Sequence, residues 1–285
     1  MVFLGITGFY AKLQVNGGLN LTKIHSTAII DKDVELGEGV EIGAFSVIQG
    51  KVNIGDHCVI MDHASIHGNL KMGSKNVIHP GAVLGNAPQD ISYRGEPTCV
   101  EIGDNNVIRE FVTINRATTK AHLKTVIGNN NLIMAYCHIA HDCIIGNDNI
   151  MPNQSTLSGH VVIGNHVHTG GMTGIHQFVT VGDYSFTGFS SRIVKDVPPY
   201  MILEGNPAEP RTVNKIGLQR SGFSEEEISL IKLAFKVLYV SDSIFPEKIK
   251  TLESPPFSQS NHIRILRDFA VASSQGRNGR ALEKK

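Results

Sequence analysis

The sequence contains few cysteines, and their spacing excludes the structures that cysteines most often build. Its 285 residues include four of them, with no CxxC pair and no known zinc-binding spacing: Cys58, Cys99, Cys137 and Cys143. Nothing in this pattern indicates a disulfide-stapled secreted domain. We interpret the four as small buried hydrophobic residues in a reducing cytoplasm.

Long apolar runs and an excess of charge of one sign are also missing. No run of 18 consecutive apolar residues occurs, so the sequence predicts no transmembrane helix and no stable membrane insertion. The 26 Lys and Arg residues balance the 26 Asp and Glu residues, which leaves no overall basic field for nucleic acid. A small molecule or a protein is therefore the expected partner.

The start of the chain does not match a targeting segment. Lys12 is the only charged residue among residues 1–22. This segment lacks the charged start, the sustained apolar run and the cleavage site of a secretory signal. We predict an N-terminal extension of unknown role over residues 1–23. A main domain over residues 24–200 and a smaller domain over residues 201–285 follow from the patterns described next.

An aliphatic residue returns every six positions through most of the chain. The first run of this repeat is Ile24, Ile30, Leu36, Ile42, Ile48, Ile54, Ile60, Ile66, Met72, Ile78 and Leu84. It resumes at Ile102 and again at Ile127, and it continues to Ile193. A period of six fits neither a helix nor an ordinary hairpin meander, and it is typical of a parallel β-helix.

Three such hexads make one triangular coil, with the aliphatic residues pointing into the prism. We expect the small residue after each of them to let the chain turn the corner. Two segments interrupt the repeat, at 85–101 and 115–126, and loops that leave a regular solenoid often carry function. After residue 200 the hexads stop. Ser224 and Glu227 form a predicted capping box, so residues 201–285 are predicted to be a helical domain that caps the prism.

Because three hexads make a coil of 18 residues, the relative positions of the polar residues can be predicted from the sequence. Residues 18 positions apart lie directly above one another, about 4.8 Å apart. His141 is therefore expected to stack on Gly159, and Asp142 on His160. The segments HIAHDC, LSGHVV and IHQFVT gather their polar residues at one corner of the prism: His141, Asp142, His160, His176 and Gln177.

This cluster is suited to proton abstraction. A neutral histidine titrates near physiological pH, and an adjacent carboxylate stabilises its protonated form. Gly159 has no side chain, which leaves its backbone N–H able to donate to a developing oxyanion. A base beside an oxyanion donor indicates acyl transfer to a hydroxyl or an amine. No nucleophilic Ser or Cys motif is present, so direct transfer is favoured over a covalent intermediate.

Three alternatives are compatible with the repeat. The same cluster could ligate zinc, as in the β-helical carbonic anhydrases. The chain could also be another hexapeptide transferase that uses acetyl-coenzyme A, although the loop at 85–101 and the helical domain disfavour both. A non-catalytic trimeric scaffold would need no clustered base. We interpret the scattered histidines, among them His63 and His166, as ordinary surface residues.

Longer motifs resemble one family, the UDP-N-acetylglucosamine 3-O-acyltransferases of lipid A synthesis. The resemblance covers residues 24–223 and is carried by APQD at 87–90, RGEPT, IREFVTINRAT, HIAHDC, GHVVIG, HQF, DVPPY, EGNPA and GLQRSGF. Hexads alone would imply only an acyltransferase or a nucleotidyltransferase. The combination of HIAHDC, GHV and HQF with the APQD loop is much narrower.

The resemblance implies a left-handed coil and the first step of lipid A biosynthesis. An (R)-3-hydroxyacyl group would pass from the phosphopantetheine of acyl carrier protein to the 3-hydroxyl of UDP-N-acetylglucosamine, with no cofactor or metal. His141 would accept the proton, Asp142 would orient it and Gly159 would bind the oxyanion. The expected substrate contacts are Gln89, Asp90, His138, His160, His176, Gln177, Phe186, Phe189, Asn214 and Arg220, with Asn214 and Arg220 near the UDP group.

The sequence departs from the family at three positions. Ser92 and Ser221 stand where basic residues are usual, and Phe189 stands where a glycine admits a longer acyl chain. We therefore predict a short acyl preference. Phe189 belongs to a different face from His141, so one acyl chain would reach both only across subunits. This favours a homotrimer with sites between subunits, in the cytoplasm where both substrates occur.

Overall fold

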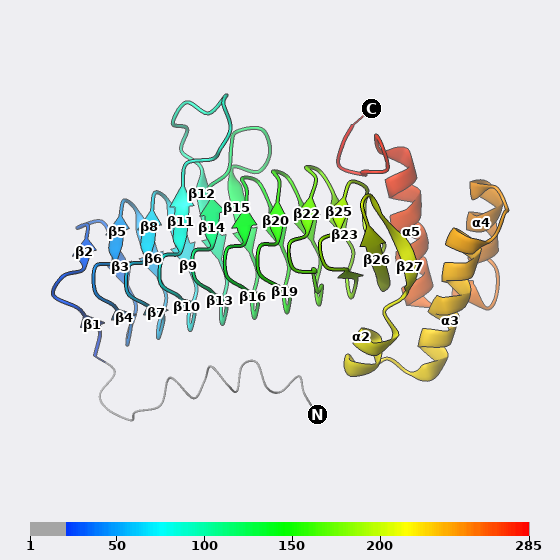
Figure 1. Ribbon diagram of the computed structural model, residues 1–285, viewed down its shortest axis with the longest axis horizontal. Coiled ribbons are helices and arrows are strands. Elements are labelled where there is room, and N and C mark those ends of the chain that lie inside the picture. The colour runs from blue at the N-terminus through cyan, green and yellow to red at the C-terminus, as the bar shows by residue number, and fades with distance from the viewer. Residues whose placement is uncertain (1–20, 285) are drawn as a thin grey trace.

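The computed structural model describes residues 21–284, and residues 1–20 of the predicted extension lie outside the described residues. The chain winds into a long prism with three flat faces, followed by a group of helices at one end (Figure 1). Each face is a parallel sheet, in which the strands of successive coils are neighbours. The predicted β-helix of hexapeptide repeats with a C-terminal helical region is confirmed.

The strands of the three sheets are short because each hexad supplies one face of one coil. The first sheet contains β1 (Lys23–Ile24), β4 (Glu41–Ile42), β7 (Val59–Ile60), β10 (Val77–Ile78), β13 (Val107–Ile108), β16 (Leu132–Ile133) and β19 (Ile150–Met151). The second contains β2 (Ile29–Ile30), β5 (Val47–Gln49), β8 (Ser65–His67), β11 (Val83–Asn86), β14 (Thr113–Asn115), β17 (His138–Ile139), β20 (Thr156–Leu157), β22 (Gly174–Ile175) and β25 (Arg192–Ile193). The third contains β3 (Glu35–Leu36), β6 (Val52–Ile54), β9 (Leu70–Met72), β12 (Cys99–Ile102), β15 (Lys124–Ile127), β18 (Ile144–Ile145), β21 (Val162–Ile163) and β23 (Thr180–Val181).

The core is a ladder of the repeated aliphatic residues. Ile114, Ile139 and Leu157 pair in successive strands and are fully buried. A second ladder is polar and lies inside the prism: the side-chain Oδ1 of Asn131 accepts the backbone N–H of Asn149 at 3.0 Å, and Asn106 does the same for Asn131 at 2.9 Å. Buried polar groups need such partners, so these asparagines fix the stacking of coils.

Glycine has a different role at the corners from the one we expected. Gly146 follows an aliphatic residue, but its φ is not positive; a Cβ there would lie 2.5 Å from the carbonyl oxygen of Gly164 in the next coil. The left-handed φ near 60° belongs to a later residue of each turn, such as Asp142, Asp148 or His160. The small residue therefore permits close approach between coils, and the left-handed φ belongs to a later residue, which is most often not a glycine.

Two loops leave the prism on the same side (Figure 1). The first, residues 87–98, connects β11 to β12, and the second, residues 116–123, connects β14 to β15. The register shows the insertions: paired residues differ by 18 positions in a regular coil, as in His138 and Thr156, but by 25 for Thr113 and His138. Both predicted interruptions are thus real loops.

The C-terminal region begins with strands. β24 (Phe186–Thr187), β26 (Met201–Gly205) and β27 (Ala208–Val213) form a small sheet that closes the last coil. The predicted helical domain started at residue 201, but the first helix of this region begins at Lys215, because Met201, Leu203 and Val213 pack on the end of the prism.

The helices that follow are α2 (Lys215–Arg220), α3 (Glu225–Phe235), the π-helix η1 (Lys236–Val240), α4 (Phe245–Leu252), the 3-10 helix η2 (Phe257–Gln259) and α5 (Asn261–Gln275). The predicted capping box of Ser224 and Glu227 is present at the start of α3. Among residues 21–284, no helix has the length and apolar character needed to cross a membrane.

Candidate active site

The predicted register holds at the corner between the second and third sheets. We call this corner, with its turns at 140–142, 158–160 and 176–178, the histidine corner. The backbone N–H of His160 donates to the carbonyl oxygen of His141 at 3.1 Å, and that of Phe178 donates to Gly159 at 3.3 Å. His141, Gly159 and Gln177 therefore lie one above another, as the 18-residue period predicts.

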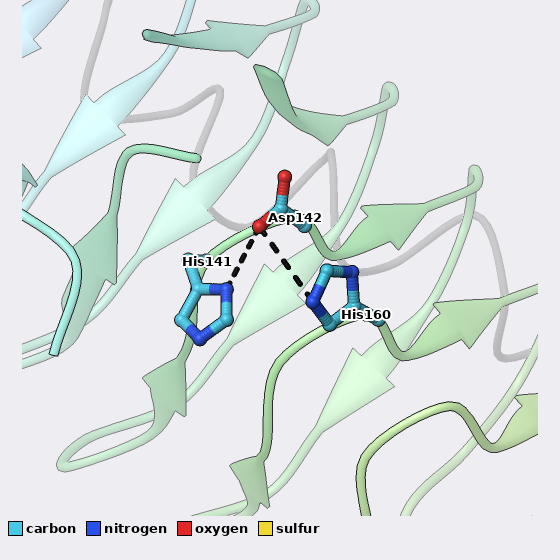
Figure 2. Close-up of side chains that lie close together, drawn as sticks. All are labelled: His141, Asp142 and His160. Carbon is cyan, nitrogen blue, oxygen red and sulfur yellow. Dashed lines mark hydrogen bonds and ion pairs between the residues drawn. The ribbon is translucent and has the colours of Figure 1, made fainter. Parts of the chain in front are cut away.

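His141 and Asp142 form a hydrogen-bonded pair at this corner. Nδ1 of His141 lies 2.8 Å from Oδ2 of Asp142, and Nε2 of His160 lies 3.9 Å from the same oxygen (Figure 2). The side chain of Asp142 is fully buried, whereas that of His141 retains 14% exposure. The carboxylate is thus shielded from water while the imidazole can still meet a substrate.

The surroundings keep Asp142 ionised. Burial alone would raise its pKa, but hydrogen bonds from His141 and from both the backbone N–H and hydroxyl of Thr118 outweigh burial and hold the pKa below its usual value. An ionised carboxylate can only accept hydrogen bonds. Nδ1 of His141 must then carry the proton, which leaves the lone pair on Nε2 free to act as a base.

Gly159 lies directly beneath the His141 ring. A Cβ at this position would be 2.5 Å from Cε1 and 2.8 Å from Nε2 of His141, so only glycine fits without moving the ring. At the neighbouring corner, the N–H of Asn147 is satisfied by the side chain of Asn165 in the next coil. Gln177 occupies the equivalent position in the coil after Gly159, and the N–H of Gly159 has no partner within residues 21–284.

Two further histidines are held neutral near this pair. Burial lowers the pKa of His138, and the charge of His141 lowers it further. Burial also lowers the pKa of His160, which stacks on Phe178 with ring centroids 4.6 Å apart. His176 and Gln177 lie two coils from His141 at the same corner, where Nδ1 of His176 is 3.0 Å from the carbonyl oxygen of Gln177.

The loop 87–98 brings Asp90 to the same corner, with Gln89 exposed beside it. Oδ1 of Asp90 accepts from the N–H and hydroxyl of Ser92 at 2.8 and 2.6 Å, and its Oδ2 lies 2.6 Å from Nζ of Lys120. The hydrogen bond from Lys120 is the main cause that lowers the pKa of Asp90. Lys120, on the second loop, thus supplies a positive charge beside Asp90.

Three other predicted residues line a cavity of about 860 Å³. Asn214 caps α2, where its side chain accepts from Gly217 at 3.1 Å and donates to the carbonyl oxygen of Tyr184 at 2.8 Å. Phe186 and Arg220 line the same cavity. Other residues of the cavity wall were not predicted. His168 and Tyr184 belong to hexads that look regular, and Lys215 and Lys232 lie on α2 and α3, outside the repeat. His166 also lines the cavity, although we predicted it to be an ordinary surface residue.

The predicted substrate residues lie on separate parts of one chain. The histidine corner joins the second and third sheets, and the cavity lies against the first sheet beside α2. Phe189 is 73% exposed at the third corner, between the first and second sheets, and its ring would lie 3.2 Å from a Cβ on Gly171. As predicted from the register, Phe189 and His141 are on different corners.

Three residues of the site were not predicted. Thr118 and Thr125 contact Asp142, the latter by accepting its backbone N–H at 2.9 Å, and Lys120 contacts Asp90. All three come from the second interruption of the hexads or its edge. The break in period marked the segment, but an aperiodic loop carries no register from which contacts could be predicted.

The structure also locates possible ligands of metals. Ligand atoms of His141, Asp142 and His160 lie within 4.8 Å of one another, so a cation would compete with the hydrogen bond between His141 and Asp142. Cysteine takes no part: burial raises the pKa of Cys137 to about 11 and that of Cys143 to about 12. Three cysteines are buried and Cys99 is partly exposed, which agrees with the predicted packing role.

Two family profiles match the sequence. The profile described as "Udp N-acetylglucosamine O-acyltransferase; Domain 2" matches residues 196–278, which include the cavity residues of α2. The profile of bacterial transferase hexapeptide repeats matches residues 124–159, which include His141 and Gly159. Each match therefore includes some of the candidate residues, those around His141 in one and those of α2 in the other.

Curated proteins and solved structures agree with these profiles. Acyl-[acyl-carrier-protein]–UDP-N-acetylglucosamine O-acyltransferases from Halorhodospira halophila and Herminiimonas arsenicoxydans are 47% and 41% identical, over 90% of this chain and 99% of each relative. The crystal structure of UDP-N-acetylglucosamine acyltransferase from Francisella novicida is 34% identical with a TM-score of 0.85, covering 92% of this chain and 97% of that one.

Proposed function

This chain belongs to the acyl-[acyl-carrier-protein]–UDP-N-acetylglucosamine O-acyltransferases of lipid A biosynthesis, and we propose that His141 is the general base of its reaction. The reaction transfers an (R)-3-hydroxyacyl group from acyl carrier protein to the 3-hydroxyl of UDP-N-acetylglucosamine, the first step of the pathway. The observation that carries the proposal is the stacking of His141 on Gly159 beside a buried, ionised Asp142.

The proton transfers follow from that geometry. Nε2 of His141 accepts the proton of the sugar 3-hydroxyl as its oxygen attacks the thioester carbonyl. Asp142 stabilises the imidazolium through Nδ1 at 2.8 Å. The N–H of Gly159 donates to the oxyanion of the tetrahedral intermediate. The intermediate then expels the phosphopantetheine sulfur, which takes the proton back from His141.

The other polar residues of the histidine corner bind the reacting groups. We assign Gln89 and Asp90 to the acceptor sugar, because both stand on the loop beside the corner. His138, His160, His176 and Gln177 line the path of the acyl chain and the phosphopantetheine. Burial holds His138 and His160 neutral, so each can donate or accept a hydrogen bond without repelling the imidazolium that forms on His141.

We assign the cavity beside α2 to the UDP group. Arg220 suits bidentate recognition of phosphate, and Phe186 and Asn214 offer an apolar ring and a polar amide on the same wall. This cavity and the histidine corner lie on different faces of one chain, so a single substrate molecule joins them only if they come from two chains. This separation supports a homotrimer with three sites between subunits.

Phe189 supports a short acyl chain. Its ring covers Gly171 and stands 73% exposed at the corner that a neighbouring subunit would present to the acyl chain. The acyl donor arrives on acyl carrier protein, so the reaction needs no bound cofactor. Since both substrates are soluble or carried by a soluble protein, we place the enzyme in the cytoplasm.

The test is a panel of donors and acceptors with purified protein whose zinc content has been measured. We expect transfer from (R)-3-hydroxyacyl carrier protein to UDP-N-acetylglucosamine, fastest with the shortest acyl chains, and no stoichiometric zinc. Transfer only to the 3-amino analogue of the sugar would overturn the proposed acceptor. Stoichiometric zinc with no acyl transfer would overturn the proposed reaction.

A further inference from the structure

The second loop contacts the catalytic pair directly. Thr118 is 3% exposed, and both its backbone N–H and its hydroxyl donate to Oδ2 of Asp142, at 3.1 and 2.7 Å. This is the same oxygen that accepts from Nδ1 of His141. Donors from two sides therefore fix the orientation of the carboxylate. Without the hydroxyl of Thr118, the carboxylate could rotate away from the imidazole.

The same loop also contacts the acceptor side of the site. The backbone N–H of Lys120 donates to the hydroxyl of Thr118 at 3.2 Å, and its Nζ lies 2.6 Å from Oδ2 of Asp90. The charges of Lys120 and Asp90 both act on His160, which places this ion pair at the histidine corner. A short chain of hydrogen bonds thus runs from Asp90 through Lys120 and Thr118 to Asp142.

The ion pair remains open to a ligand. The side chain of Lys120 is 51% exposed, while that of Asp90 is 11% exposed. An ammonium group has three N–H donors, and Asp90 is the one acceptor of Nζ among residues 21–284. The remaining donors face solvent beside Asp90 and can reach hydroxyl or phosphate oxygens of a bound sugar nucleotide.

We propose that Thr118 and Lys120 are positioning residues of the acyl transfer, with Lys120 holding the acceptor sugar nucleotide at Asp90 and Thr118 holding Asp142 against His141. This inference rests on the proposed role of His141 and Asp142. It assigns different kinetic effects to two residues of one loop: Lys120 acts on acceptor binding, whereas Thr118 acts on the base after the acceptor has bound.

The experiment measures kcat and the KM for UDP-N-acetylglucosamine at saturating acyl carrier protein. We expect Thr118→Val to lower kcat about tenfold with KM within twofold, because a misplaced base slows the chemical step. Thr118→Ser restores the hydroxyl and should restore most of kcat. Lys120→Met should raise KM about tenfold with a smaller effect on kcat.

Two comparisons separate these effects from loss of structure. Lys124 forms a similar exposed ion pair with Glu101 at 2.9 Å at the base of the same loop, so Lys124→Met should leave both constants within twofold. Adding Thr118→Val to Asp142→Asn should cause little further loss of kcat, since both changes act on one interaction.

The outcomes distinguish this inference from the function on which it rests. If Thr118→Val and Lys120→Met keep the wild-type kcat and KM while His141→Ala is inactive, the roles of Thr118 and Lys120 are overturned and the proposed base still stands. Full activity of His141→Ala would overturn the proposed base. If Thr118→Val does not fold, two other measurements decide the inference. The KM for UDP-N-acetylglucosamine should rise in Lys120→Met and not in Lys124→Met, and Thr118→Ser should keep at least a third of the wild-type kcat.

Discussion

Substitution of Gly159 by alanine gives the sharpest geometric test of the site. The added Cβ would lie 2.5 Å from Cε1, 2.8 Å from Nε2 and 3.0 Å from Nδ1 of His141. Ordinary contact begins at 3.4 Å, so the ring must retreat by about 0.9 Å. A retreat of that size stretches or breaks the 2.8 Å hydrogen bond to Asp142. The backbone itself tolerates alanine, because φ of Gly159 is not in the left-handed region.

We expect Gly159→Ala to lower kcat about 100-fold, since a displacement of about 1 Å costs roughly that factor in a positioned reaction. Its melting temperature should stay close to that of the wild type. Gly174→Ala is the control for the effect of a glycine-to-alanine change on folding, because a Cβ on Gly174 meets nothing within 4 Å. The assay is steady-state acyl transfer. A Gly159→Ala enzyme with kcat within threefold of the wild type would refute the stacking of His141 on Gly159 as a requirement of the reaction.

Three further predictions concern the charge, the core and the acyl site. The pKa of Asp142 is lowered in the folded chain, so its ionised form stabilises the fold above about pH 4, and this stabilisation is lost as the pH falls through the folded pKa. The difference in melting temperature between the wild type and Asp142→Asn should therefore become smaller below about pH 4. A difference that stays constant with pH would contradict this reasoning. Asn131→Ala removes the acceptor of the buried N–H of Asn149 and should cost about 1–3 kcal/mol in the free energy of unfolding, measured by denaturant titration, whereas the exposed Asn53→Ala should cost under about 0.5 kcal/mol. Phe189→Gly should shift the preferred donor to a longer acyl chain, and an unchanged preference would show that Phe189 does not set the length.

The fold could be predicted because its period is rigid. Each coil repeats the same three corners, so the aliphatic positions predicted the prism and the 18-residue offset predicted the stacking of His141 on Gly159. The same offset placed Phe189 on another corner. Register is reliable here because a shift by one residue would turn every buried side chain outward.

The parts that depend on aperiodic segments could not be predicted. The loop 116–123 has no repeat, so neither the hydrogen bonds from Thr118 to Asp142 nor the ion pair of Lys120 with Asp90 could be read from spacing. The hairpin of β26 and β27 was predicted to be part of the helical domain, because the hexads stop after residue 200 and no repeat marks its two strands. The glycines after the aliphatic residues were read as turn residues, although their role is close approach to the next coil.

The central claim is that His141 is the general base. Its most direct test compares acyl transfer by His141→Ala and by the wild type at equal protein concentration, with a short (R)-3-hydroxyacyl carrier protein and UDP-N-acetylglucosamine. His63→Ala is the matched control, because His63 stacks on Phe45 at a different corner. The account predicts that loss of the base lowers kcat by about 10²- to 10⁴-fold in a protein that still folds, with a wild-type rate for His63→Ala. A His141→Ala enzyme that keeps more than a third of the wild-type rate would contradict the account.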